Sequence, residues 1–172
     1  MSEINLHRAA GVLLGMAAGD ALGAGYEFKP SIGEGAQVAM AGNRLWEPGE
    51  GTDDTDMAIA IAEAAADGAD LCDPAVLDGV ARSWYEWSRQ SKDVGIQTRA
   101  VFSAANAAGV SFTSMTAAAE DVHHSLGRSG GNGSLMRTAP VALAFLHDEE
   151  ALIEAARTVS SMTHFDPEAG DA

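Results

Sequence analysis

A helical hydrophobic period runs through nearly the whole chain, and it limits the possible folds more than any other feature. Alanine, leucine, isoleucine and methionine recur at helical spacing, and no segment alternates steadily between apolar and polar residues. The pattern predicts an all-α fold, a compact multi-helix bundle in which residues 1–172 form a single domain. The predicted helices cover residues 5–20, 53–67, 73–89, 95–108, 113–126, 140–147 and 149–161.

Charge and cysteine content narrow the partners and the compartment. The chain has 25 acidic and 10 basic residues, a formal net charge of −15, which repels nucleic-acid backbones and anionic membranes. Cys72 is the only cysteine, so an internal disulfide and a zinc–thiolate cluster are excluded. Asp20 interrupts the apolar run of residues 9–26, which predicts a buried helix and not a membrane span. We expect a cytoplasmic protein.

Two features of the first quarter of the chain concern packing. Gly11, Gly15, Gly19 and Gly23 recur every four residues, and such a smooth stripe lets another helix approach closely. The first helix is therefore expected at the centre of the bundle. Residues 29–51 are rich in glycine and proline, and a connection this long in a small domain predicts a lid or flap.

The stretch GTDDTDMAIAIAEAAA, residues 51–66, crowds aspartates at the start of an apolar helix. One interpretation is structural, because acids favour the positive end of a helix dipole and Thr52 or Asp53 suits the N-cap position. The other is a metal site, because the neighbouring carboxylates of Asp53 and Asp54 repel each other unless a cation lies between them. These residues alone leave both interpretations open.

The stretch SGGNGS, residues 129–134, is the second glycine-rich segment. Its glycines permit close approach and unusual backbone angles, so that successive N–H groups can surround a phosphate. The alternative is a flexible connector between two helices, because the segment lacks the lysine of a P-loop.

Single polar residues complete the candidates. Asp20 lies among small residues, where a carboxylate is expected to bond to backbone donors of a neighbouring segment. Glu27 follows that helix and could act as a general base or be an ordinary surface acid. Asp93 is a candidate N-cap, and His164 is either a structural hydrogen-bonding residue or part of a site.

Taken in chain order, these segments resemble one family, the ADP-ribosylglycohydrolases of the dinitrogenase-reductase-activating type. The resemblance covers essentially the whole chain. Its motifs are GDALG at 19–23 with Glu27, TDDT at 52–55, DVG at 93–95, GNGSLMR at 131–137 with AP at 139–140, and TH at 163–164.

The resemblance implies a fold, an activity and a set of site residues. It implies an all-α hydrolase that removes ADP-ribose from a modified substrate by cleaving the glycosidic bond at the anomeric carbon. It also implies two Mg²⁺ ions, or Mn²⁺, held by Thr52, Asp53 and Asp54, with Glu27, Asp53 and Asp54 as catalytic residues. The implied substrate-binding residues are Asp93, Gly95, Ser129, Gly130, Gly131, Asn132, Gly133, Ser134 and His164.

Two departures from the family pattern bear on function. Ile96 stands where many relatives carry asparagine, which concerns recognition of the leaving group. The chain also lacks the late DTD-like segment that supplies the opposing metal ligands, so it is expected to be the amino-terminal portion of the family fold. The missing half is expected on a second chain or in a longer protein.

The expected substrate is an ADP-ribosylated protein or small molecule, and a nucleic acid only if it carries ADP-ribose. The linkage, to arginine, serine or another group, stays open. An alternative function is a non-catalytic ADP-ribose-binding or structural helical protein on the same scaffold.

Overall fold

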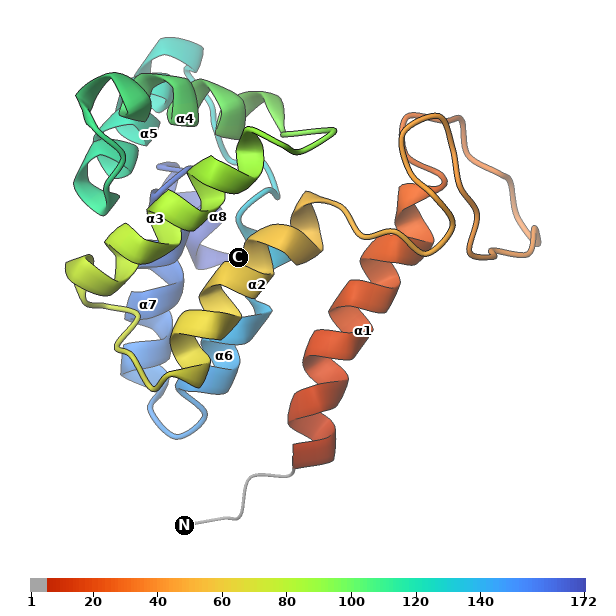
Figure 1. The fold of residues 1–172 in the computed structure, drawn as a ribbon, viewed down its shortest axis with the longest axis horizontal. Helices are drawn as coiled ribbons and strands as arrows, with labels where there is room; N and C mark the ends of the chain where they lie inside the picture. Colours follow the sequence, from red (N-terminus) through yellow and green to blue (C-terminus); the bar gives the residue numbers. More distant parts are fainter. Residues whose placement is uncertain (1–5) are drawn as a thin grey trace.

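The structure is a computed structural model that describes residues 6–172 (Figure 1). Within that range the regular elements are all helical, which confirms the predicted all-α fold. They are α1 (Leu6–Ala24), α2 (Asp53–Ala66), α3 (Pro74–Ser88), α4 (Ile96–Ala108), α5 (Phe112–Leu126), the 3₁₀ helix η1 (Leu135–Arg137), α6 (Ala139–Ala144), α7 (Glu149–Ser161) and α8 (Pro167–Asp171).

Local sequence signals explain where the helices begin and end. Asp73 accepts a hydrogen bond from the N–H of Ala75 ahead of Pro74, and α3 starts there. Ser111 and Ser114 form a reciprocal capping box at the start of α5, and Gly127 ends that helix in a left-handed conformation. The two short elements η1 and α8 were not predicted, because a single turn carries too little hydrophobic period to detect.

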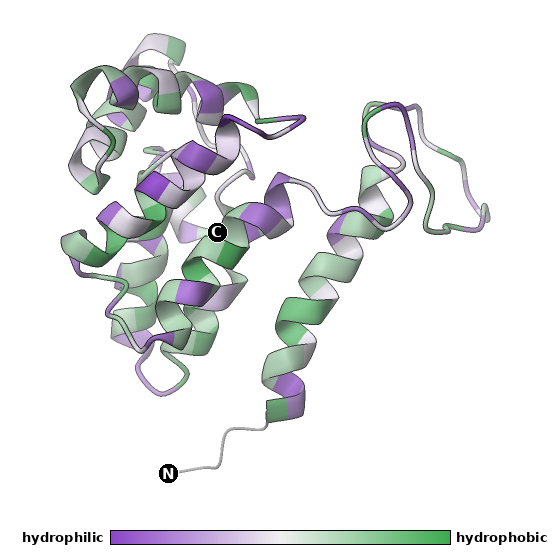
Figure 2. Cartoon of the chain, viewed as in Figure 1, coloured by the Kyte–Doolittle hydropathy of each residue, from purple (hydrophilic) through white to green (hydrophobic). Residues whose placement is uncertain are grey.

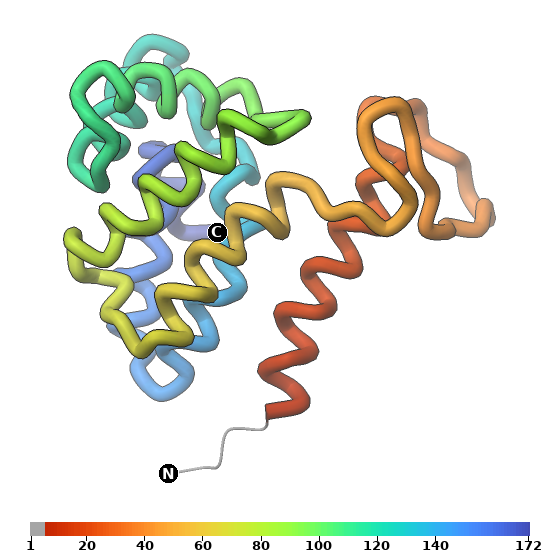
Figure 3. Tube along the Cα trace, viewed as in Figure 1, coloured from red at the N-terminus to blue at the C-terminus, as the bar shows by residue number. Residues whose placement is uncertain are grey.

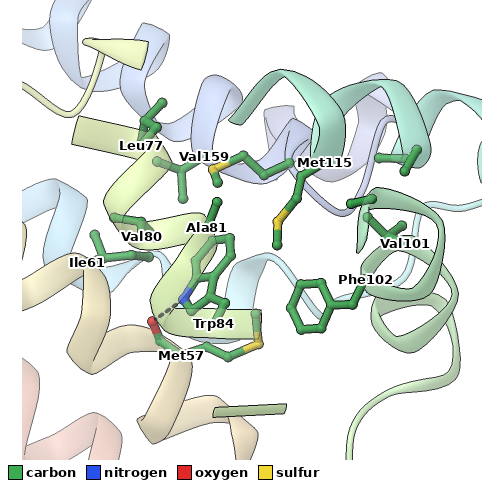
Figure 4. Close-up of a cluster of buried hydrophobic side chains, with 14 of the residues drawn as sticks. Met57, Ile61, Leu77, Val80, Ala81, Trp84, Val101, Phe102, Met115 and Val159 are labelled. Atoms are coloured by element: carbon green, nitrogen blue, oxygen red, sulfur yellow. Dashed lines mark hydrogen bonds between the residues drawn. The ribbon is translucent and has the colours of Figure 1, made fainter. Parts of the chain in front are cut away.

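The hydrophobic core lies between α2, α3, α4, α5 and α7 (Figure 4). Trp84 of α3 is fully buried in it and donates its indole N–H to the carbonyl of Met57 at 2.8 Å. This bond ties the start of α2, which carries the aspartates, to the centre of the molecule. The labelled core residues are Met57, Ile61, Leu77, Val80, Ala81, Trp84, Val101, Phe102, Met115 and Val159.

Helix α1 lies to one side of the other helices, where it packs against α2 and α6 (Figures 1 and 3). Its only buried residues are Ala21 and Ala24. Leu6 and Leu14 are 77% and 69% exposed, and the outer surface of α1 is largely apolar (Figure 2). The prediction of a buried helix is therefore wrong for this chain.

The glycine stripe of α1 also faces open space. A Cβ atom added at any of the four stripe positions would meet no heavy atom within 4 Å, so no helix within residues 6–172 uses the close approach that the stripe permits. The prediction of a central helix is wrong for the same reason, because periodicity identifies a face that can be packed but not the element that packs on it. The four positions are Gly11, Gly15, Gly19 and Gly23.

The connection from α1 to α2 has no helix or strand and is held at a few points. Asn43 donates to the carbonyl of Ala24 at 2.7 Å, and the Tyr26 hydroxyl bonds to the carbonyl of Ala39 at 2.9 Å. A Cβ at Gly25 would lie 2.0 Å from the Ala41 carbonyl oxygen, so this close approach requires glycine. The proposed role of the segment as a lid stays a prediction.

No helix within residues 6–172 has the combined length and apolarity that crossing a bilayer requires.

Candidate functional site

Asp20 of α1 caps helix α2 from outside. Its Oδ2 accepts hydrogen bonds from the backbone N–H groups of Thr52 and Thr55, at 2.8 and 3.1 Å, and from the Thr55 hydroxyl at 2.5 Å. Its Oδ1 accepts from the Thr52 hydroxyl at 2.7 Å. The predicted bonding of Asp20 to backbone donors of a neighbouring segment is confirmed. A Cβ at Gly51 would come within 3.2 Å of Asp20, so a larger residue there would disturb the arrangement.

This arrangement decides which group caps α2. Thr52 has the N-cap position, as predicted, but its side chain makes no capping hydrogen bond and donates to Asp20 instead. The carboxylates of Asp53 and Asp54 are therefore not needed to cap α2. Of the structural interpretation of the aspartates, only the favourable interaction of acids with the helix dipole remains, and that interaction does not require two adjacent acids.

Both adjacent aspartates bear an electrostatic cost. Burial raises the pKa of Asp54 to about 6, and the negative charges of Asp20 and Asp53 add to the rise. Burial also raises the pKa of Asp53, with Asp93 and Asp20 adding to it, against hydrogen bonds to its own backbone and to Thr52. Within residues 6–172, no salt bridge from a basic side chain offsets these charges. We call Asp20, Glu27, Asp53, Asp54 and Asp93 the acidic cluster.

Glu27 faces the same cluster from the end of α1. Burial raises its pKa, and the charge of Asp53 adds to the rise. The indole N–H of Trp46 lies near enough to lower the pKa in part, although it is buried without reaching full hydrogen-bond geometry to any acceptor. Glu27 also lines a cavity of about 670 Å³ with Phe28, Asn43 and residues around them. A protonatable acid beside a cavity fits a general base or acid.

Asp93 belongs to the acidic cluster rather than to a helix cap. Its charge raises the pKa of both Asp53 and Glu27. The N-cap of α4 is Gly95, two residues later and without a side-chain bond, so the predicted capping role of Asp93 is wrong. Ile96, which follows, is 92% exposed.

The segment of residues 129–134, called the glycine loop from here on, lies against His164. A Cβ at Gly133 would come within 2.9 Å of His164 Cε1 and 3.0 Å of its Nε2, and one at Gly131 would lie 3.7 Å from Nε2. Gln97 of α4 donates to the carbonyls of Ser129 and Thr163, at 3.1 and 2.9 Å, and so joins the loop to the histidine segment. The structure thus brings together two motifs that lie 30 residues apart in sequence.

The serines at the two ends of the glycine loop are buried in internal contacts. The Ser129 hydroxyl lies 2.7 Å from Nδ1 of His123, and Asp166 lies 4.0 Å from the same ring nitrogen. The Ser134 hydroxyl points to the Ala169 carbonyl at 3.4 Å. Contact between these serines and a phosphate would therefore run through backbone N–H groups.

Three residues that shape the site were not among the predicted ones. Gln97, Trp46 and Arg137 each place a donor beside a predicted residue. Arg137 had a usable signal, because it is a lone base in the apolar stretch LMRTAPVALA. Gln97 and Trp46 had none, since an amide or an indole in a helical pattern carries no local mark of its contacts.

The profile of the ADP-ribosylglycohydrolase family matches residues 1–172. The chain belongs to this family. It is 32% identical over 169 residues to the ADP-ribosylarginine hydrolase Tri1 of Pseudomonas putida (strain GB-1), covering 94% of this chain and 43% of that protein. It is 29% identical over 171 residues to the Tri1 of Serratia proteamaculans (strain 568), covering 95% and 44%.

A solved structure gives the same placement. The chain superposes on a protein described as an ADP-ribosylglycohydrolase-related protein complex with a TM-score of 0.72 and 32% identity. The match covers 95% of this chain and 51% of the other. This ADP-ribosylglycohydrolase chain thus spans about half the length of the proteins that it matches.

The acidic cluster of this chain has the right donors for a hard cation but too few of them. Hydroxyl and carboxylate oxygens are what Mg²⁺ and Mn²⁺ prefer, and Thr52, Asp53 and Asp54 supply them. Among the residues that the structure describes, however, no three His, Cys, Asp or Glu side chains converge as a metal-binding group. A complete site would need further oxygens from water, substrate or another segment.

Proposed function

We propose that this chain supplies one half of the active site of a divalent-metal-dependent ADP-ribosyl hydrolase. The observation that carries the proposal is the pair Asp53 and Asp54. Asp20 already caps α2, so the two carboxylates are held side by side at an electrostatic cost that no structural task requires. A cation would remove that cost. Family membership supports the same reaction class.

The proposed roles follow the position of each group. Thr52, Asp53 and Asp54 would hold Mg²⁺ or Mn²⁺, which supplies polarisation of the attacking water and of the ribose hydroxyls when bound. Glu27 accepts a proton from the attacking water, since its raised pKa brings the carboxylate closer to working pH. Attack at the anomeric carbon passes through an oxocarbenium-like state, which nearby carboxylates stabilise.

The diphosphate is assigned to the glycine loop. Backbone N–H groups of Gly130, Gly131, Asn132 and Gly133 are available to a chain with few bases to spare, and the ring of His164 borders them. Asp93 and Gly95 are assigned to the side of the distal ribose and the leaving group. Because two matched relatives carry the name ADP-ribosylarginine hydrolase, we infer that the group released is arginine, on a protein or a small molecule.

The outer face of α1 is proposed as the docking surface for the other half of the family fold. Leu6, Val12 and Leu14 are exposed there beside the glycine stripe, where an added Cβ would meet no atom of the described residues within 4 Å. The relatives have more than twice this length, so a segment of comparable size is available to cover the face. The same segment would complete the open side of the acidic cluster.

Docking can be measured with the unmatched part of the Pseudomonas putida relative, expressed as a separate chain. Leu14→Glu should weaken its binding to the 172-residue chain by at least about tenfold, since it places a charge in an apolar contact. Ile153→Glu is the matched control, because Ile153 is an exposed apolar residue on α7. Equal binding by both variants would rule out α1 as the docking surface.

The second candidate, a non-catalytic ADP-ribose binder, is distinguished by a titration. Mn²⁺ and ADP-ribose are added separately and together to the purified chain, to the Asp53→Asn/Asp54→Asn variant and to Asp56→Asn. Asp56 is the matched control, because it is in the same helical turn but is exposed and bonds to Trp87. Metal binding that is lost only in the double variant supports the hydrolase. ADP-ribose binding indifferent to Mn²⁺ in all three proteins supports the binder.

A further inference from the structure

Arg137 is a fully buried guanidinium: burial lowers its pKa to about 9, and the negative charge of Asp53 opposes that lowering without a salt bridge between the two. It is 0% exposed, and its Cζ lies 4.1 Å above the ring of Trp84. No salt bridge in the described part of the chain includes it, and its Nε is buried without an acceptor. A buried charge without a salt bridge is costly, and an apolar residue of similar volume at such a place is often neutral or stabilising. The cost points to a task for this cation.

The donors of Arg137 lead to the histidine of the site. Its Nη2 donates to the Val159 carbonyl at 3.3 Å and to the Thr163 hydroxyl oxygen at 2.7 Å. The Thr163 hydroxyl lies 2.8 Å from Nδ1 of His164. Three residues from two segments therefore form one continuous line of contacts, Arg137 to Thr163 to His164.

Hydrogen-bond chemistry sets the direction of this line. A guanidinium can only donate, so the Thr163 oxygen accepts from Arg137, and its single proton is left for His164 Nδ1. If Nδ1 carried a proton instead, the Thr163 proton would need another acceptor, and none is found for it within residues 6–172. The satisfied arrangement leaves Nδ1 as an acceptor and puts the ring proton on Nε2.

The Nε2 side of the ring faces the place where a ligand is expected. Nε2 and Cε1 border Gly131 and Gly133, and His164 also lines a cavity of about 340 Å³ with Arg157 and Asp166. No hydrogen bond to Nε2 is formed by any residue of the described range. An N–H group at this position is available to an oxygen of a bound molecule.

We propose that Arg137 and Thr163 are positioning residues that hold His164 in its neutral Nε2–H tautomer, so that it donates to a diphosphate or ribose oxygen of the ligand. The assignment of that ligand rests on the proposed function; the tautomer does not. Burial and the nearby cation of Arg137 also lower the pKa of His164 to about 4, which keeps the ring neutral at ordinary pH. The histidine is thus a fixed donor over the working range and not a switch.

The tautomer can be read directly from the ¹⁵N chemical shifts of the imidazole nitrogens in the labelled 172-residue chain, with His164→Gln used for assignment. We expect a protonated Nε2 and an unprotonated Nδ1. Thr163→Val removes the hydroxyl at constant shape and should produce a mixture of tautomers, while Thr163→Ser should restore the single form. Thr158→Val on α7 is the matched control, since Thr158 is not bonded to a histidine.

Arg137→Met gives a second and independent measurement. It removes the cation at similar volume, and it should shift the tautomer in the same direction as Thr163→Val. A proton on Nδ1 of the unaltered chain, or a single Nε2–H form that persists in both variants, would overturn the proposal. These spectra need neither metal nor turnover, so their result stands whether or not the chain proves to be a hydrolase.

Binding of ADP-ribose then tests the purpose of the tautomer. Thr163→Val should weaken ADP-ribose about tenfold, the usual effect of one lost hydrogen bond, with Thr163→Ser and Thr158→Val near the unaltered value. Unchanged affinity alongside a changed tautomer would overturn the positioning role. Failure of the unaltered chain to bind ADP-ribose would count instead against the proposed function, and the spectra would still decide the tautomer.

Discussion

The acidic cluster and the glycine loop differ in how far their charged and polar groups are balanced within the chain. In the acidic cluster, burial and the negative charges of neighbouring acids raise the pKa values of Asp53 and Asp54. At the glycine loop, buried Arg137 and neutral His164 bond through Thr163, and Gln97 joins the two segments. Among the described residues, the first region gains some attraction from buried Arg137 but has no salt bridge. The second satisfies most of its polar groups within the chain.

This difference distinguishes the residues that serve binding from the residues that serve folding. A region whose charges are not balanced within the chain should gain folding stability, and lose function, when one of those charges is removed. A region that is satisfied internally should lose stability when a contact is disturbed. Five measurements test that contrast, from the largest expected effect to the smallest.

The strongest test removes both adjacent carboxylates. In a preparation in which the chain is completed by the other half of the fold, Asp53→Asn/Asp54→Asn should lower release of ADP-ribose by more than about 10⁴-fold, because the metal ligands and the activation of water are lost together. Helical circular dichroism should stay unchanged, since Asp20 caps α2. Turnover equal to that of Asp56→Asn would mean that the two acids serve only the helix.

Within the acidic cluster, a change at Glu27 distinguishes a role in proton transfer from a role in holding the ligand. Glu27→Gln should slow kcat by roughly 10²–10⁴-fold, the usual effect of losing a general base, with ADP-ribose affinity nearly preserved. The matched change at an exposed acid of the same connection is Glu34→Gln. If the Glu27 variant raises KM and leaves kcat alone, the residue holds substrate and does not transfer the proton.

Gly133 tests whether the glycine loop is as tightly packed as the contacts indicate. Gly133→Ala should lower the free energy of unfolding by about 1–3 kcal/mol, because its Cβ would lie 2.9 Å from Cε1 of His164. Gly131→Ala in the same loop should cost much less, since its Cβ would lie at an ordinary 3.7 Å. Urea denaturation measures both; equal losses would mean that the histidine ring moves aside freely.

Substitution of Asp54 should stabilise the fold, unlike substitution of Gly133, and the size of the effect should depend on pH. The pKa of this acid is about 6 in the folded chain against 3.8 for an ordinary aspartate, so its ionisation destabilises the fold as pH rises from about 4 to 6. Asp54→Asn should therefore raise the free energy of unfolding above pH 6, by about 1 kcal/mol because the group is partly exposed. The gain should vanish below pH 4.

Divalent metal sharpens that last measurement. Mn²⁺ should stabilise the unaltered chain but not the Asp54→Asn variant, since binding to the folded state adds to its stability. For the chain without its other half we expect millimolar or weaker Mg²⁺ binding, because the three proposed ligands leave most of the coordination to water. A denaturation series with and without metal decides both points. Tight binding of metal by the lone chain would show that the acidic cluster is already complete.

Much of the fold could be read from the sequence because it depends on neighbours along the chain. The limits of α2, α3, α5 and α7 follow caps such as Asp73 and Ser111 and the helical period. The residue that caps α2 could not be predicted from neighbours along the chain. Its donors are bonded by Asp20, 32 residues away, and no local signal says which distant carboxylate will reach a helix end.

The candidate site divides along the same line. Asp53, Asp54, Glu27 and the glycine loop were singled out because their residue types are unusual in their local surroundings. The direction of the contacts was not predictable, since the line from Arg137 through Thr163 to His164 joins η1 to the turn after α7. The metal, diphosphate and catalytic roles assigned to these residues stay predictions until the variants above are measured.

The sequence by itself determined the longer helices, the family and the chemical types gathered in the site, because short-range periodicity and motif spacing carry that information. Only the tertiary structure decided which groups are satisfied and which are not. Among the described residues, it gave the cap of α2 to Asp20, left Asp53 and Asp54 beside each other without a salt bridge, and buried Arg137 beside Trp84. It also left the glycine stripe of α1 uncovered, because burial depends on the surface that packs against a helix and not on the helix alone.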